Sequence, residues 1–295
     1  MKGITKKFPL LKHKKRANAS HSRAGNVVSF LILVIMGLFM ALPIILSVSN
    51  SLKPLEELFV FPPKFLVRNP TTDNFTDLFT LMSESWVPFT RYLFNTVFVT
   101  VAGTLGHMLI ASMCAFALAK RKFPGAKLIF GVIVTALMFS VQVTAIPNYL
   151  IMSKIGWLDT YASLIVPAIA KPLGLFLMKQ FMEQIPDALL EAARIDGAKE
   201  FTVFFKVALP QVKPALLTLL IFCFQDLWNI QGANYIYSEN LKTLPYALSQ
   251  ISAAGISRAG VSAAVTVIMM TVPIILFMLC QSNIVETMAS SGIKD

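Results

Sequence analysis

Four long stretches of the chain contain no Asp, Glu, Lys or Arg. They are 29, 28, 26 and 27 residues long, at residues 24–52, 92–119, 128–153 and 259–285. Because a helix needs about 20 apolar residues to cross roughly 30 Å of hydrocarbon, we expect each to span a membrane. Two further stretches, interrupted by Lys171 and by Asp226, are still long enough. The pattern predicts an all-α integral membrane protein with six transmembrane helices, at about residues 26–50, 92–119, 128–153, 160–180, 214–238 and 259–285.

The composition leads to the same class of protein. Hydrophobic residues make up 56% of the 295 residues and charged residues 14%, against about 45–50% and about 25% in soluble domains. A water-soluble fold of this size could not cover its surface with so few polar residues. The first apolar run is longer than the 7–15 residues of a signal-peptide core, so we expect it to be retained. Cys114, Cys223 and Cys280 lie in apolar runs and are interpreted as small packed side chains.

Basic residues are distributed unequally between the two sides of these spans. With the N-terminus inside, 18 Lys and Arg residues fall in inner segments and 7 in outer segments. Because cytoplasmic segments are enriched in Lys and Arg, we expect both termini to be cytoplasmic. The tail at residues 1–25 is expected to lie beside anionic lipid. Nucleic-acid binding is not favoured, because no base-reading module accompanies the tail. The outer segment, residues 50–91, is too short for a domain with its own core.

The inner segment at residues 181–213 has the pattern of two short helices joined by a glycine. Pro186 and Asp187 suit the first turn of a helix over residues 187–196, and Gly197 suits its C-terminal end. The second helix would gather apolar side chains on one face, at Phe201, Phe204, Phe205 and Ala208. On this pattern alone, the segment could equally be an interfacial helix that only anchors the loop.

A spaced motif within this segment favours a more specific interpretation. Its fixed positions are Glu191, Ala192, Ala193, Gly197, Val207, Leu209 and Pro210. The spacing resembles the EAA loop of ABC-importer permeases, E-A-A-x3-G-x9-I-x-L-P, with Val207 in place of Ile. Asp196 and Ala198 extend the resemblance to the form common among sugar permeases. From about Asn26 onward, the chain is similar to the MalG-like permeases of carbohydrate ABC importers.

This resemblance implies a permease subunit that translocates a sugar or oligosaccharide across the cell membrane of a bacterium. The implied partners are a second related permease in a heterodimer, two ATPase subunits, an extracytoplasmic sugar-binding protein and membrane lipid. ATP and Mg would be bound by the ATPases, and no cofactor by this chain, whose sequence has no G-x-x-x-x-G-K-[ST] motif. We call residues 181–213 the coupling loop. The implied ATPase-coupling residues are Glu191, Ala192, Ala193, Asp196, Gly197, Ala198, Leu209 and Pro210.

In such importers this loop docks on the ATPases and moves when they close around ATP. We therefore expect Glu191→Lys or Gly197→Asp to leave membrane insertion intact and to abolish coupling to the ATPases.

Polar side chains inside the spans suggest a substrate path. Asp226 lies near the middle of the fifth predicted span, where a charge costs about 2.5–3.5 kcal/mol on insertion scales. One hypothesis is a sugar-facing wall, with Trp228 stacking on a sugar ring, formed by Gln225, Asp226, Trp228 and Asn229. The other is contact between helices, including a pair between Asp226 and a cation of the partner permease. Lys171 is expected to extend toward the interface, and His107 to be packed and hydrogen-bonded.

Two other classes of function remain as alternatives. A self-sufficient secondary transporter or channel for a small polar solute would show inverted repeats, broken helices and several intramembrane charges. The predicted spans contain chiefly Lys171 and Asp226. A membrane-embedded enzyme using Asp226 and His107 is the second alternative, but no H-E-x-x-H or G-x-S-x-G motif occurs. We therefore expect no catalytic residue and no metal site.

Overall fold

The structure is a computed structural model that describes residues 23–62, 64–84, 86–253 and 255–291. All regular elements in these ranges are helices, which confirms the predicted fold class for the described residues. The chain divides into two compact units, residues 1–46 and 47–295. The first unit contains most of α1 (Arg23–Ser51), whose large apolar side chains are mostly exposed, as expected of a helix in lipid. The predicted basic tail lies, apart from residues 23–25, outside the described residues.

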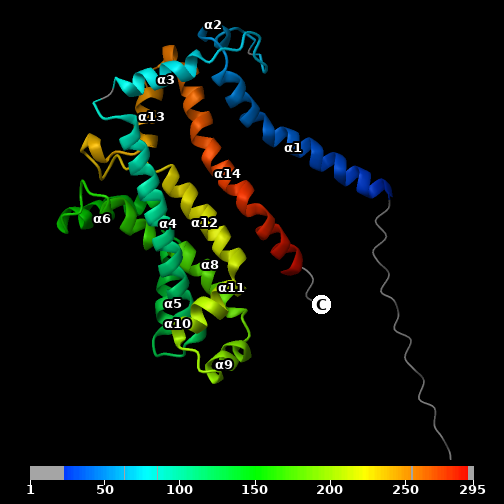
Figure 1. Cartoon of the computed structure of the whole chain (residues 1–295), viewed down its shortest axis with the longest axis vertical. Coiled ribbons are helices and arrows are strands. Elements are labelled where there is room, and N and C mark those ends of the chain that lie inside the picture. Colours follow the sequence, from blue (N-terminus) through cyan, green and yellow to red (C-terminus); the bar gives the residue numbers. More distant parts are fainter. Residues whose placement is uncertain (1–22, 63, 85, 254, 292–295) are drawn as a thin grey trace, which may run out of the picture. The chain divides into compact units, whose positions relative to one another are not determined.

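The second unit consists of helices of very different lengths (Figure 1). The long ones are α4 (Phe89–Lys120) and α14 (Ala259–Ser291). The others are α2 (Leu55–Leu58), α3 (Asp73–Ser83), α5 (Ala126–Ala136), α6 (Val141–Lys154), α7 (Ala162–Ile169), α8 (Pro172–Glu183), α9 (Asp187–Ile195), α10 (Glu200–Thr202), the π-helix η1 (Val203–Ala208), α11 (Leu209–Gln211), α12 (Lys213–Trp228), η2 (Glu239–Leu241), α13 (Leu244–Ser252) and η3 (Ile256–Arg258).

Four helical segments are long and apolar enough to cross a membrane without a sharp bend. They are Gly25–Ser51, Phe89–Lys120, Ala162–Glu183 and Ala259–Gln281. Two further segments are pairs of helices that bend sharply at a short break: α5 with α6, at 111°, and the helices of Glu200–Gln211 with α12, at 82°. The predicted number of six spans is reached when each bent pair counts as one span.

The structure corrects two of the predicted spans. Residues 128–153 do not form one straight helix, because α5 ends at Ala136 and α6 begins at Val141. The predicted span at 214–238 ends ten residues early, at Trp228, with Asn229 as the cap residue. Gly232 has a φ of +65°, so a right-handed helix does not resume there. The apolar pattern predicted which residues suit lipid, but it carried no signal for the bend.

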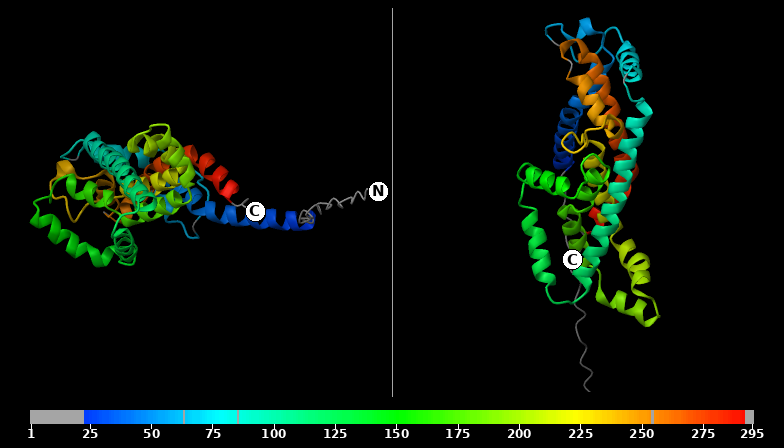
Figure 2. Two further views of the ribbon diagram at one scale, coloured as in Figure 1. Left: turned by 90° about the horizontal axis from the view of Figure 1, so that it is seen from below. Right: turned by 90° about the vertical axis from the view of Figure 1, so that its left-hand side faces the viewer.

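Helix α4 is the central element of the second unit. It packs along α7, α8 and α12, and Figures 1 and 2 show it running from one end of the unit to the other. Apolar cores lie against it near the coupling loop, along its middle and, as described below, near its first turn. The core nearer the coupling loop includes Ala115, Phe116, Met178, Met182, Leu190, Val203, Phe204 and Ala208. The middle core joins α4 to α7 and α12 through Val99, Leu164, Ala168, Cys223 and Leu227. The longest described span is therefore anchored along its whole length.

The opposite end of the unit carries α2, α3 and α13 (Figure 1). Residues of the predicted outer segment form no core alone, but α3 shares a core with α4, α13 and α14, through Leu78, Met82, Tyr92, Leu244, Leu248 and Val261. Polar groups of α4 fix the chain after α12: Asn95 Nδ2 donates to the carbonyls of Asn240 and Lys242 at 2.9 and 2.8 Å. The backbone N–H of Leu244 donates to Thr96 Oγ1 at 2.7 Å.

Candidate functional site

The coupling loop lies at the end of the unit opposite α3 and α13 (Figures 1 and 2). Its first helix, α9, begins immediately after Pro186, whose fixed φ suits a helix start. One face of α9 packs inward: Leu190 is 1% exposed, and Ala193 contacts the same apolar core. Leu189, next to Leu190 in the chain, is 40% exposed.

Gly197 ends α9 in the way that the sequence pattern predicted. Its φ is +82°, and no atom lies within 4 Å of where a Cβ would stand. The Ala198 N–H donates to the Ala193 carbonyl and the Gly197 N–H to the Arg194 carbonyl, both at 3.0 Å. These two bonds form the Schellman arrangement, which satisfies the last carbonyls of a helix by means of a left-handed residue. Gly197 is thus required for its backbone conformation and not for lack of space.

The predicted apolar stripe on the second helix is only partly correct. Phe204 and Ala208 are buried, but Phe201 is 67% exposed and Phe205 44% exposed. The reason is that residues 203–208 form a π-helix instead of an α-helix. Its wider turn shifts side chains around the axis, so the i, i+3, i+4, i+7 pattern no longer defines one face.

Two basic residues at the end of α4 hold the coupling loop, and the sequence analysis did not identify them. Lys120, whose side chain is 6% exposed, donates to the Ile185 carbonyl at 2.5 Å and to Asp187 at 2.8 Å. Arg121 forms an ion pair with Glu200 at 2.6 Å, and Arg194 pairs with the same carboxylate at 3.1 Å. The loop is therefore bound to α4 as well as to α8 and α12, its neighbours in the chain.

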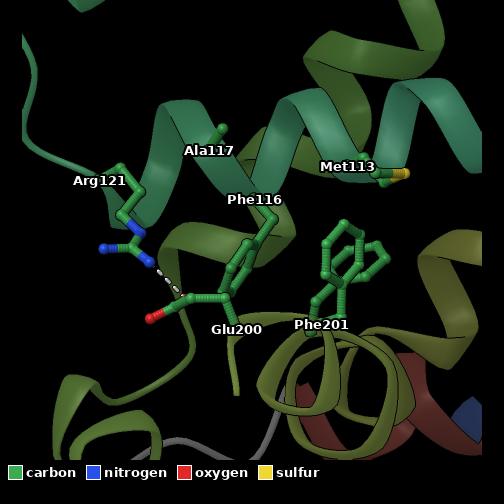
Figure 3. A pocket seen from close by; sticks show the side chains of 7 residues that line it. Met113, Phe116, Ala117, Arg121, Glu200 and Phe201 are labelled. Atoms are coloured by element: carbon green, nitrogen blue, oxygen red, sulfur yellow. Dashed lines mark ion pairs between the residues drawn. The ribbon is translucent and has the colours of Figure 1, made fainter.

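Figure 3 shows the contact between α4 and the second helix of the loop. A cavity of about 170 Å³ is lined by Met113, Phe116, Ala117, Arg121, Glu200, Phe201 and Phe204. The rings of Phe116 and Phe204 pack with centroids 5.4 Å apart. The ion pair between Arg121 and Glu200 lies at the edge of this apolar contact, so charge and packing fix the same junction.

The carboxyl groups of these ion pairs are charged at neutral pH, because the pKa of each is lowered. The Lys120 hydrogen bond, followed by its charge, lowers the pKa of Asp187 below its usual value. Burial acts to raise the pKa of Glu200, but hydrogen bonds from Arg121 and Arg194 outweigh it and the pKa is lowered. A lowered carboxyl pKa contributes stability above the ordinary pKa near 4 and loses it as the pH falls further. Acidification to pH 5 should therefore leave the junction intact.

The motif residues divide into two groups by exposure. Ala193, Ala198, Val207 and Leu209 are half-buried and pack on the core of the loop. The others are exposed: Glu191, Ala192, Asp196, Gly197 and Pro210. Ile195, between them, is 86% exposed. α9 and its cap residue Asp196 thus expose a small side chain, the bulky apolar side chains of Leu189 and Ile195, and the carboxylates of Glu191 and Asp196.

The residues proposed for a substrate path do not all lie together. Gln225 and Asn229 line a groove of about 790 Å³ with residues of α13 and α14, among them Pro245, Ser249, Thr266 and Met269. Trp228 is 4% exposed, donates from Nε1 to the Met269 carbonyl at 3.0 Å and stacks on Phe224. Its position does not support stacking on a sugar, since the indole joins α12 to α14.

Asp226 and Lys171 form an ion pair at 2.8 Å. Lys171, which was expected to extend toward the membrane interface, points to Asp226 instead, so a cation of the same chain already lies beside this carboxylate. His107 is buried, with Nδ1 2.8 Å from the Ile169 carbonyl, as the packed interpretation predicted. Among the described residues, no group of three His, Cys, Asp or Glu side chains is arranged to hold a metal ion.

Comparison with known proteins relates this arrangement to a family. Residues 107–289 match the family described as "Binding-protein-dependent transport system inner membrane component". The chain is 28% identical over 279 residues to the arabinooligosaccharides transport system permease protein AraQ of Halalkalibacterium halodurans, covering 90% of this chain and 95% of that protein. It is 31% identical over 216 residues to the diacetylchitobiose uptake system permease protein NgcG of Streptomyces coelicolor, covering 72% of this chain and 70% of that protein.

The fold is also similar to that in a crystal structure of a bacterial ABC transporter involved in the import of the acidic polysaccharide alginate. The TM-score is 0.74 at 23% sequence identity, and the match covers 88% of this chain and 98% of that chain.

Proposed function

The chain belongs to the family of inner membrane components of binding-protein-dependent transport systems, and on this basis we propose that it is a permease subunit of an ATP-driven importer of sugars. The relatives AraQ and NgcG are named for arabinooligosaccharides and diacetylchitobiose, which supports an oligosaccharide as the substrate. The chain itself is a multi-pass transporter subunit, and ATP hydrolysis takes place on partner subunits.

The observation that carries the proposal is the geometry of the coupling loop. α9 exposes Glu191, Ala192 and Ile195, while Leu190 and Ala193 secure its other face. Small side chains allow another protein to approach closely, and an exposed Ile can fill an apolar pocket there. A loop that only anchored the chain in the interface would not need the ion pairs that bind it to α4.

The mechanism follows from these attachments. In the proposed cycle, two ATPase subunits bind ATP and Mg, close, and move the α9 surface that is docked on them. Lys120 and Arg121 transmit this displacement to α4, and α11 transmits it to α12. Tilting of these helices would alternately open a central cavity to each side, and the difference in contacts between the two states supplies the coupling free energy.

The same proposal assigns partners and orientation. The end that carries the coupling loop faces the cytoplasm, together with both termini, and the end with α3 and α13 faces the sugar-binding protein. A second related permease completes the path, in which Gln225 and Asn229 line one wall. The two bent spans are a feature also expected of secondary transporters, but the family of the chain favours the ATP-driven importer.

We expect Ile195→Asp to weaken docking of the ATPases about fivefold, because burying an unpaired carboxylate at an interface is unfavourable. The side chain is 86% exposed, so the substitution should not disturb folding. The measurement is the amount of ATPase subunit that co-purifies with the tagged chain from membranes. Leu66→Asp, also on an exposed apolar side chain, is the matched control from the predicted outer segment. Equal co-purification of Ile195→Asp and wild type would contradict docking on α9.

We expect Gln225→Ala to raise the sugar concentration needed for half-maximal uptake about threefold, because one amide hydrogen bond contributes about 0.5–1.5 kcal/mol. The readout is concentration-dependent uptake of arabino-oligosaccharides and diacetylchitobiose by cells. Trp228→Phe is the control: it removes the bond to Met269 but should leave this concentration unchanged. A larger shift for Trp228→Phe than for Gln225→Ala would reverse the assignment of the groove.

A further inference from the structure

A second large cavity lies beside the coupling loop and is not used by the mechanism above. It has a volume of about 740 Å³ and lies between the end of α4, the start of α5 and the end of α8. Its basic side chains are Arg121, Lys122, Lys127 and Lys179, and its only carboxylate among the lining residues is Glu183. The remaining lining is apolar, including Leu118, Phe123, Ala126 and Phe130.

The charges of this cavity are only partly compensated. Lys179 pairs with Glu183 at 2.6 Å and also lies over the Phe130 ring, and Arg121 pairs with Glu200. No ion pair is found for Lys122 or Lys127 among the described residues, and both are exposed. The cavity therefore offers two uncompensated cations to a ligand, with a third, Arg121, shared with the coupling loop.

The place of the cavity in the membrane indicates what kind of anion can reach it. It opens where the apolar span α4 ends at Lys120 and the apolar helix α5 begins at Ala126. This boundary is where the headgroups of the bilayer lie. A basic pocket between membrane helices at this depth has the charge and the apolar surface that suit an acidic lipid.

We propose that this cavity binds the headgroup of an anionic glycerophospholipid, with its phosphate between Lys122 and Lys127 and its glycerol against Phe123 and Phe130. A free phosphate ion would leave most of the 740 Å³ and its apolar lining unfilled. The inference requires only that the chain spans a membrane, and it stands or falls independently of the proposed transport function.

A lipid bound in this cavity would also affect the coupling loop through Arg121. Arg121 lines both this cavity and the smaller cavity at the loop, and it pairs with Glu200. A phosphate near Arg121 competes with Glu200 for the same guanidinium. The lipid composition of the membrane is thereby linked to the junction between α4 and the coupling loop.

The test is a lipid titration of the purified full-length chain, read by native mass spectrometry as bound lipid per chain. The probes are phosphatidylglycerol and phosphatidylcholine. We expect the double variant Lys122→Gln/Lys127→Gln to bind phosphatidylglycerol about thirtyfold more weakly, since each Lys near a membrane surface contributes about 1 kcal/mol. Lys206→Gln/Lys213→Gln is the matched control, because it removes the same charge from exposed positions that do not line the cavity.

The proposal is supported if only the cavity variant loses affinity and phosphatidylcholine binds weakly to wild type. An equal loss in both double variants would overturn it in favour of general surface charge. Displacement of the lipid by an equal concentration of inorganic phosphate would also overturn it, since the site would then bind free anions. Co-purification of ATPase subunits, measured separately, reports on the transport function and not on this site.

Discussion

Replacing Gly197 by Val should reduce co-purification of the ATPase subunits about fivefold to thirtyfold while leaving the chain in the membrane. The φ of +82° at this position costs a residue with a side chain roughly 1–2 kcal/mol, and a β-branched residue is disfavoured further. No atom lies within 4 Å of the new Cβ, so the effect comes from the backbone alone. The α9 terminus would lose the bond from Ala198 to Ala193 and change its direction.

The control for this prediction is Gly197→Asn, since Asn visits the left-handed region readily. It should retain co-purification within about twofold of wild type. Asp also adopts the left-handed backbone conformation more readily than most residues. Gly197→Asp therefore tests the effect of an added charge more than the effect of the backbone conformation. If Val and Asn have the same effect, the left-handed turn is not what the loop requires.

Replacing Lys120 by Met should release the start of α9 from α4. The Lys120 side chain is almost fully buried, and its loss leaves the carbonyl of buried Ile185 without this donor, while the exposed Asp187 carboxylate can turn to water. A buried polar group without a partner costs about 1–3 kcal/mol, which corresponds to a factor of about 5 to 150 in an equilibrium. We expect amide hydrogen exchange in residues 187–196 to accelerate by about that factor, with a parallel loss of co-purified ATPase.

Lys206→Met is the matched control, because Lys206 is exposed and forms no ion pair among the described residues. Its exchange in residues 187–196 should be that of wild type. Unchanged exchange in Lys120→Met would show that Leu190 and the apolar core hold α9 without help from α4.

The sequence predicted those features of the coupling loop that depend on a single residue, such as the start of a helix at a proline or its end at a glycine. Proline fixes the backbone at the start of α9 and glycine permits the left-handed turn after its end, so the predicted start at Asp187 is confirmed and the predicted end is one residue late. The apolar runs predicted the membrane class for a similar reason, since transfer into lipid depends on composition more than on contacts. The motif at residues 191–210 led to the family that the comparisons show.

The parts that were missed depend on contacts between distant residues. Lys120 and Arg121 looked like charges that only set orientation, because nothing local to them signals a bond to residues 65 or more positions away. The π-helix at residues 203–208 and the bend between α5 and α6 depart from regular helix geometry, which hydrophobic spacing assumes throughout. Trp228 was a candidate for stacking on a sugar ring, because the sequence could not show that its indole N–H donates to the Met269 carbonyl and joins α12 to α14.

A single helix, α4, is long enough to connect the two sides of a membrane. The 32 residues of α4 make a helix of about 48 Å, bonded near its first turns to the segment before α13 and at its last turn to α9. In the proposed cycle, binding of the sugar-binding protein on one side and closure of the ATPases around ATP on the other would both change the position of α4. Thermodynamic reciprocity requires that each event strengthen or weaken the other by the same factor, without any relay of side chains through the bilayer.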